Sequence, residues 1–171
     1  MKLELFTPDL SNRHEITHAI SSEFSNYYNG VGKFTVVLPM DDYNIGIAAV
    51  NSILYIVDRK LAYEVQEVQH DCDSNEITLN GYSLNKRLDR RVVAEKATIS
   101  NVETDAYSIV TANLRGLPIQ LAESKGLTET VESTEIYGDE LLSALEPVLT
   151  DAELGNKAVL DYKAKTITWE I

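Results

Sequence analysis

The residues His14-Glu15-Ile16-Thr17-His18 satisfy the pattern H-E-x-x-H, the sharpest indication of enzyme chemistry in the sequence. On an α-helix the two histidines would share one face and bind a single Zn²⁺, with Glu15 as general base for peptide hydrolysis. In an extended segment they lie ~13 Å apart, at roughly 3.3 Å per residue, and cannot share a metal. The residues that follow, rich in Thr, Ile, Phe, Tyr and Ser, favour the extended form. A small zinc metallopeptidase is therefore the alternative hypothesis.

Two further stretches match ligand-binding loops only in part. Gly30-Val31-Gly32-Lys33 resembles the end of a phosphate loop, but Tyr27 stands where the first glycine is required and Phe34 follows the lysine. Residues 71–75 begin like a calcium loop, but Glu76 replaces the essential glycine. Both stretches are better explained as turns. We therefore predict no catalytic residue, no metal and no cofactor.

A basic cluster is the clearest candidate for an interaction site. Four of the fifteen basic residues fall within six positions of a chain whose net charge is -12. They are Lys86, Arg87, Arg90 and Arg91. On a helix these residues form two basic rows beside an apolar row, which consists of Leu84, Leu88 and Val92. The pattern predicts a contact surface for an acidic protein; a solvated helix face with Asp89 as counterion is the competing interpretation.

Short antiparallel strands are the elements expected to position these residues in the first half of the chain. Alternating apolar and polar residues and the turn residues between them indicate strands at 2–6, 34–38, 52–57, 62–69 and 77–79, and extended structure over 16–28. Asp41 and Asp42 begin a short turn or helix through Val50, and a short helix follows Gly81. Five or six such strands predict a small barrel or sandwich.

Helical patterns appear among the strands in the second half. The sequence predicts a helix from Asp105 to Leu114, strands at 119–122 and 128–135, and a final hairpin of 157–162 and 166–171. A helix over 138–154 contains Pro147, which should kink or split it, with Thr150 and Glu153 as a capping box for the second piece.

The predicted fold class is therefore α+β and mainly antiparallel β. We expect a β-barrel-like domain over 1–96 and a smaller α+β domain over 97–171. Because the chain ends inside a predicted strand, the second domain is expected to be truncated.

Composition narrows the choice of partners. The chain has 171 residues, 44% of them hydrophobic, which is enough for one domain or two small ones with real cores. Its acidic balance, with a pI near 4.6, opposes nucleic acid as the main partner. No segment reaches the ~20 apolar residues of a membrane helix, so we predict no membrane insertion. Cys72 is the only cysteine, which excludes an intrachain disulfide and suits a reducing cytoplasm.

Three stretches, taken in order, resemble the amino-terminal part of siphophage tail proteins of the baseplate-hub and tail-associated lysin type. They are residues 27–39, YYNGVGKFTVVLP; residues 53–58, ILYIVD; and residues 81–93, GYSLNKRLDRRVV. The resemblance implies a structural, non-enzymatic protein of the phage or prophage tail tip, made in the bacterial host cytoplasm. It also implies self-association as a trimer and contacts with other tail proteins. A generic β-rich binding module is the third hypothesis.

Overall fold

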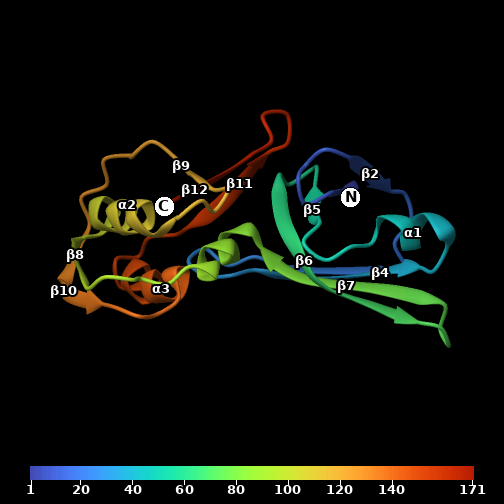
Figure 1. Cartoon of the computed structure of the whole chain (residues 1–171), viewed down its shortest axis with the longest axis horizontal. Helices are drawn as coiled ribbons and strands as arrows, with labels where there is room; N and C mark the ends of the chain where they lie inside the picture. The colour runs from blue at the N-terminus through green and yellow to red at the C-terminus, as the bar shows by residue number, and fades with distance from the viewer. The chain divides into compact units, whose positions relative to one another are not determined.

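Seven strands form one antiparallel sheet in the computed structural model, which describes residues 1–171 (Figure 1). The strand order is β2-β1-β5-β6-β7-β4-β3, and every neighbouring pair is antiparallel. The strands are β1 (Leu3–Phe6), β2 (Arg13–Ile16), β3 (Ser21–Ser25), β4 (Lys33–Pro39), β5 (Ile53–Ile56), β6 (Leu61–Asp71) and β7 (Glu76–Ser83). The predicted class, α+β with mainly antiparallel strands, is confirmed. The sheet does not close into a barrel, because β2 and β3 are its two edges and do not pair with each other.

The contacts within the chain define two units. Unit 1 contains residues 1–26, 31–84 and 159–165. Unit 2 contains residues 27–30, 85–158 and 166–171. The predicted boundary between 96 and 97 concerns parts that fold independently, and it stays a prediction.

Local sequence explains the elements of unit 1. In β4 and β7 every second residue is buried, as expected for strands with one face on a core. The short helix α1 (Asp42–Ile47) follows β4, and Asp41 caps it by accepting a hydrogen bond from the backbone N–H of Asn44 at 2.7 Å. The expected start of this helix is confirmed, although the helix ends three residues before Val50.

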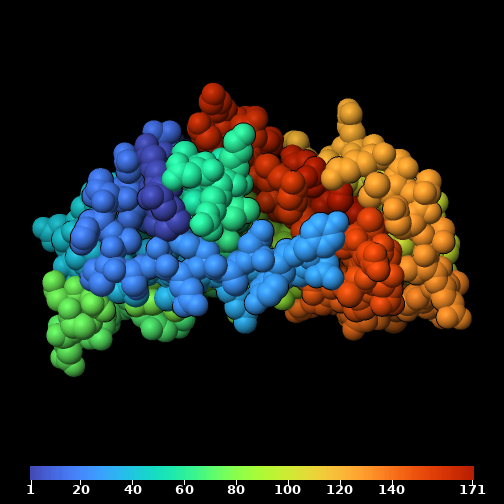
Figure 2. Space-filling model, turned by 180° about the vertical axis from the view of Figure 1, so that it is seen from behind, coloured from blue at the N-terminus to red at the C-terminus, as the bar shows by residue number.

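The turn 159–165 belongs to unit 1, and aromatic contacts attach it there. The ring of Tyr162 lies 5.8 Å from that of Phe6 and 5.9 Å from that of Tyr55, measured between centroids. Figure 2 shows this turn, in red, beside the green turn between β5 and β6. Two turns that are about a hundred residues apart in sequence therefore lie next to each other.

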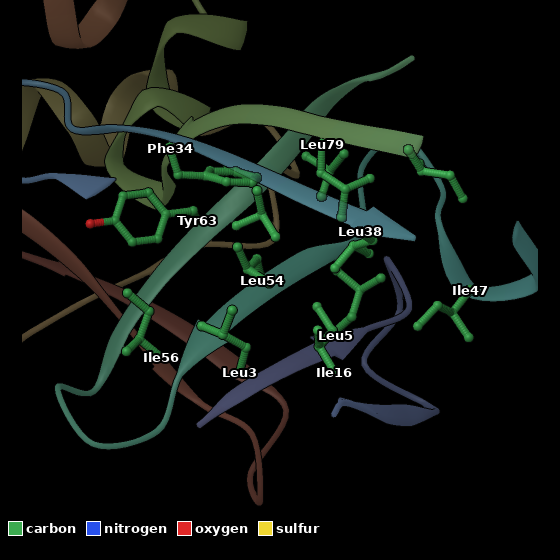
Figure 3. Close-up of a cluster of buried hydrophobic side chains, with 13 residues drawn as sticks. Leu3, Leu5, Ile16, Phe34, Leu38, Ile47, Leu54, Ile56, Tyr63 and Leu79 are labelled. Carbon is green, nitrogen blue, oxygen red and sulfur yellow. The ribbon is translucent and has the colours of Figure 1, made fainter. Parts of the chain in front are cut away.

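One apolar cluster forms the core of unit 1. Figure 3 shows its side chains pointing toward one another from β1, β4, β5, β6 and β7. The cluster consists of Leu3, Leu5, Ile16, Phe34, Val36, Leu38, Ile47, Leu54, Ile56, Tyr63, Val65, Ile77 and Leu79. Tyr63 is 1% exposed, and its hydroxyl donates a hydrogen bond to the carbonyl of Ser25 at 3.3 Å, so its polar end is satisfied.

Unit 2 combines two longer helices with small sheets. Its elements are β8 (Ala97–Asn101), α2 (Val102–Asn113), β9 (Gln120–Leu121), β10 (Thr130–Ile136), α3 (Leu141–Asp151), β11 (Lys157–Asp161), whose end lies in unit 1, and β12 (Thr166–Glu170). β10 pairs with β8, and β9 pairs in parallel with β12. Trp169 of β12 is fully buried and meets the ring of Tyr107 edge-on at 5.6 Å. No helix in the chain has both the length and the apolar character needed to cross a membrane.

Two helix predictions are wrong in detail. α3 runs unbroken from Leu141 to Asp151 with Pro147 inside it, because a proline removes only one hydrogen bond and its other neighbours keep the helix buried. Thr150 therefore lies within the helix and donates to the carbonyl of Glu146 instead of capping a second piece. α2 begins at Val102 rather than Asp105, whose carboxylate accepts hydrogen bonds from the backbone just before the helix.

Gly81 lies inside β7, although the sequence suggested that it ends the strand. A Cβ at this position would lie 1.9 Å from the carbonyl oxygen of Glu64 and 2.6 Å from Cε1 of Phe34. The partner strand β6 has an irregular register at this point, between Val65 and Glu67. Glycine is therefore required for the close approach of two backbones and not for a turn.

We expect Gly81→Ala to lower the free energy of unfolding by about 3 kcal/mol, because the backbone oxygen of Glu64 cannot move away without breaking the sheet. Chemical denaturation measures the change. Gly46→Ala is the matched control: no atom lies within 4 Å of its Cβ, and alanine in helix α1 should be neutral or stabilising. Equal effects of the two substitutions would contradict this account of β7.

Candidate interface segment and its contacts

The predicted basic cluster lies on a 3₁₀ helix, η1 (Leu84–Arg90), and just after it. Leu84 and Leu88 are fully buried, as predicted. Val92 is 46% exposed and Val93 is buried instead, so the predicted apolar row is wrong at its last position. The helix ends at Arg90, so Val92 lies beyond it and the helical spacing no longer determines which way its side chain points.

Lys86 and Asp89 attach the segment to the start of α3. The carboxylate of Asp89 accepts hydrogen bonds from the backbone N–H groups of Leu142 at 2.8 Å and Ser143 at 2.9 Å. It thereby satisfies two of the unpaired donors at the helix N-terminus, where a negative charge is also favourable. Lys86 donates to the other carboxylate oxygen at 2.7 Å. This hydrogen bond raises the pKa of Lys86, so the stabilisation that its positive charge contributes is lost as pH rises through that pKa.

Arg91 attaches the same segment to the end of α2. Its Nε donates to the carbonyl of Leu114 at 3.0 Å, and its Nη2 donates to the carbonyl of Arg115 at 3.3 Å. These carbonyls follow the last turn of the helix, where backbone oxygens lack helical partners and a cation is favourable. One short segment therefore supplies an anion to the start of one helix and a cation to the end of another.

The remaining two candidates are placed differently. Arg87 is buried, with 6% of its surface exposed, whereas Arg90 is exposed. Both have interactions with other groups in the structure. The four basic residues therefore do not form one continuous basic surface, and their role as a protein interface stays a prediction.

A buried network of amide side chains joins three distant stretches in unit 2. Asn85 donates to the side-chain oxygen of Asn156 at 2.8 Å and to the carbonyl of Gly30 at 3.3 Å. Asn156 in turn donates through its side chain to the carbonyl of Asn29 at 3.2 Å and through its backbone to the carbonyl of Tyr28 at 3.0 Å. The loop 27–30 is thus fixed by residues that lie far away in the sequence.

Gly155 permits this arrangement. A Cβ there would lie 2.6 Å from the carbonyl oxygen of Tyr28 and 2.7 Å from an atom of its ring. Sequence reasoning explained residues 30–33 as a turn and missed the network. Unlike charge or hydrophobic periodicity, a hydrogen bond between side chains 71 positions apart leaves no local pattern.

The H-E-x-x-H residues lie in extended structure, as the neighbouring sequence predicted. β2 contains His14 and Glu15, and His18 lies beyond its end. The ring of His14 contacts that of Tyr43 edge-on, with 6.4 Å between centroids. No group of three or more His, Cys, Asp or Glu side chains is arranged to hold a metal ion. The helical zinc-site geometry required by the metallopeptidase hypothesis is not present.

Solved structures of tail proteins share this fold. The prophage tail protein gp18 from Listeria monocytogenes EGD-e aligns with 99% of this chain and 50% of its own, with a TM-score of 0.64 and 12% identity. The tail protein from Neisseria meningitidis MC58 aligns over the same shares, with a TM-score of 0.56 and 12% identity. The E. coli c3393 protein aligns with 88% of this chain and 45% of its own, with a TM-score of 0.51 and 15% identity.

The c3393 protein is described as a component of the type VI secretion system with structural similarity to the T4 bacteriophage tail proteins gp27 and gp5. The chain spans about half the length of the solved structures that it matches. Its fold is therefore that of one part of a tail protein.

The chain belongs to the family described as Siphovirus ReqiPepy6 Gp37-like protein, whose model matches residues 2–171. No curated protein matches it. The family and the tail-protein neighbours together support a structural role in a phage tail.

We expect Asp89→Ala to lower the free energy of unfolding by about 1–2 kcal/mol, because α3 loses its N-terminal acceptor and Lys86 loses its closest partner. Thermal and chemical denaturation measure the loss. Asp139→Ala, two residues before the helix, removes the same charge from an exposed side chain that makes no hydrogen bond in the structure, and should leave stability nearly unchanged. The explanation fails if both variants unfold alike.

Proposed function

We propose that the chain is a structural component of the tail tip of a phage or prophage, of the baseplate-hub type, which joins the tail tube to the distal tail. One observation carries the proposal: 99% of the chain aligns with one half of a prophage tail protein. Membership of a siphovirus family agrees with it. The described similarity of the c3393 protein to gp27 and gp5 of T4 favours the hub over other parts of the tail.

The open edges of the seven-stranded sheet also support an assembly role. β2 and β3 each pair on one side only, which leaves a row of backbone N–H and C=O groups without strand partners. In β3 the residues Ser21, Ser22 and Glu23 are exposed. Neighbouring subunits in a tail would cover such edges, which otherwise favour uncontrolled pairing with other chains.

The proposed partners are further copies of the chain, as a trimer, and other tail proteins. The proposed location is the tail tip of the virion, after synthesis in the cytoplasm of the bacterial host.

The proposed role is structural and not enzymatic. The sharpest catalytic alternative needed His14 and His18 on one helix, and β2 holds the first of them in a strand. For the basic cluster we propose a protein contact through Arg90, the exposed member, while Lys86 and Arg91 keep their contacts with the two helices.

Immunogold electron microscopy of the particle tests the proposed location. A short epitope inserted in the exposed turn between β6 and β7, at Asp73, should place gold at the distal end of the tail. The same epitope on the major tube protein should label the whole tube and serves as the control. Gold along the tube, on the head, or on no part of purified particles would contradict the proposal.

A further inference from the structure

Four exposed basic side chains lie on the two adjacent turns of unit 1 and make no ion pair. They are Arg59 and Lys60, between β5 and β6, and Lys163 and Lys165, between β11 and β12. Lys86 and Arg91 differ from them, because Lys86 binds Asp89 and Arg91 binds the carbonyl of Leu114 within the same chain. In a chain with a net charge of -12, these four exposed cations form no ion pair, although Asp58 and Asp161 lie in or next to the same turns. We call these residues the basic tip.

The basic tip is held in place by its own turns. Tyr162 packs against Phe6 and Tyr55, which fixes the two turns beside each other. The carboxylate of Asp161 accepts hydrogen bonds from the backbone N–H groups of Lys163 and Ala164, both at 2.9 Å. The lysine side chains therefore extend from an ordered turn, so binding a partner does not require the backbone of the turn to be ordered as well.

Unit 2 carries a pocket of the opposite charge. A shallow pocket of about 280 Å³ lies between β10 and α3 and is lined by Thr130, Val131, Glu132, Thr134, Val148 and Asp151. The carboxylates of Glu132 and Asp151 make no ion pair in the structure and are exposed. The surrounding sequence, residues 126–156, contains eight acidic residues and no basic one. The acidic residues are Glu129, Glu132, Glu135, Asp139, Glu140, Glu146, Asp151 and Glu153.

We propose that the basic tip of one copy of the chain binds the β10–α3 pocket of a second copy. An ammonium group of Lys163 or Lys165 would lie between the two carboxylates, and its methylene chain would contact Val131 and Val148. The contact joins different surfaces on the two copies, as a ring of subunits requires. The inference rests on the proposed function, in which further copies of the chain are among the partners.

The charges favour a second copy over other anionic partners. Nucleic acid and anionic membranes are repelled by the net charge of -12, whereas the exposed carboxylates of the pocket complement the basic tip. Two copies of the chain also repel each other at long range. Salt screens that repulsion beyond about 8 Å at physiological ionic strength, whereas charges in direct contact are screened less.

Charge exchange between two variants tests the contact. The variant K163E/K165E carries an acidic tip, and the variant E132K/D151K carries a basic pocket. Light scattering across a concentration series should show that wild type self-associates. Each variant alone should self-associate with an affinity at least about tenfold lower. An equimolar mixture of the two should regain association, because each tip then meets a pocket of opposite charge.

The control variant K33E/R115E makes the same change of net charge as K163E/K165E, at two exposed positions outside both surfaces. It should associate as wild type does, and circular dichroism should show that all the variants are folded. Wild type that stays monomeric up to its solubility limit would overturn the inference, as would a mixture that fails to recover. Binding of duplex DNA or anionic vesicles that K163E/K165E abolishes, without any change in self-association, would also overturn it.

These outcomes are separate from the test of the proposed function. A chain labelled at the tail tip whose association ignores the charge reversals would leave the proposed function standing and refute this interface. A chain that is absent from the tail but shows the charge-dependent association would refute the proposed function and leave the interface standing.

Discussion

The hydrogen bond between Asn85 and Asn156 is the interaction on which the arrangement of unit 2 most depends. Both side chains are nearly fully buried, and a buried amide that loses its partner costs about 1–3 kcal/mol. Their remaining donors bind the carbonyls of the loop 27–30, so the same pair orders a segment that lies between two strands of unit 1 in the sequence. Satisfying these polar groups together therefore defines one conformation of three stretches of chain.

In the segment after β7, charged side chains likewise satisfy polar groups that lie far away in the sequence. Asp89 and Arg91 satisfy the ends of α3 and α2, and Lys86 neutralises Asp89. A dense run of charge in the sequence is thus used largely for folding. Exposed charges that make no ion pair within the chain are also available to a partner, and those of the basic tip and the β10–α3 pocket are among them.

The sequence predicted what depends on neighbours along the chain. Several local features could be predicted from the sequence: the alternation in β4 and β7, the cap at Asp41 and the extended structure around His14. The fold class followed from them. Prediction from the sequence failed where contacts between distant residues determine the local structure. Gly81 resembles a turn residue in the sequence, but in the structure it lies inside β7 against the backbone of Glu64. Pro147 looks like a break until the buried face of α3 is known. The four basic residues were found, but their separate environments were not.

The central claim is that this chain is a structural subunit of a tail tip. Cryo-electron microscopy of intact particles tests it most directly, because the seven-stranded sheet and the two helices of unit 2 can be fitted into density as separate bodies. The account predicts density for the chain at the distal end of the tail tube, with three copies around the tail axis. Particles that are complete and infective but contain no density for this fold at the tip would contradict it.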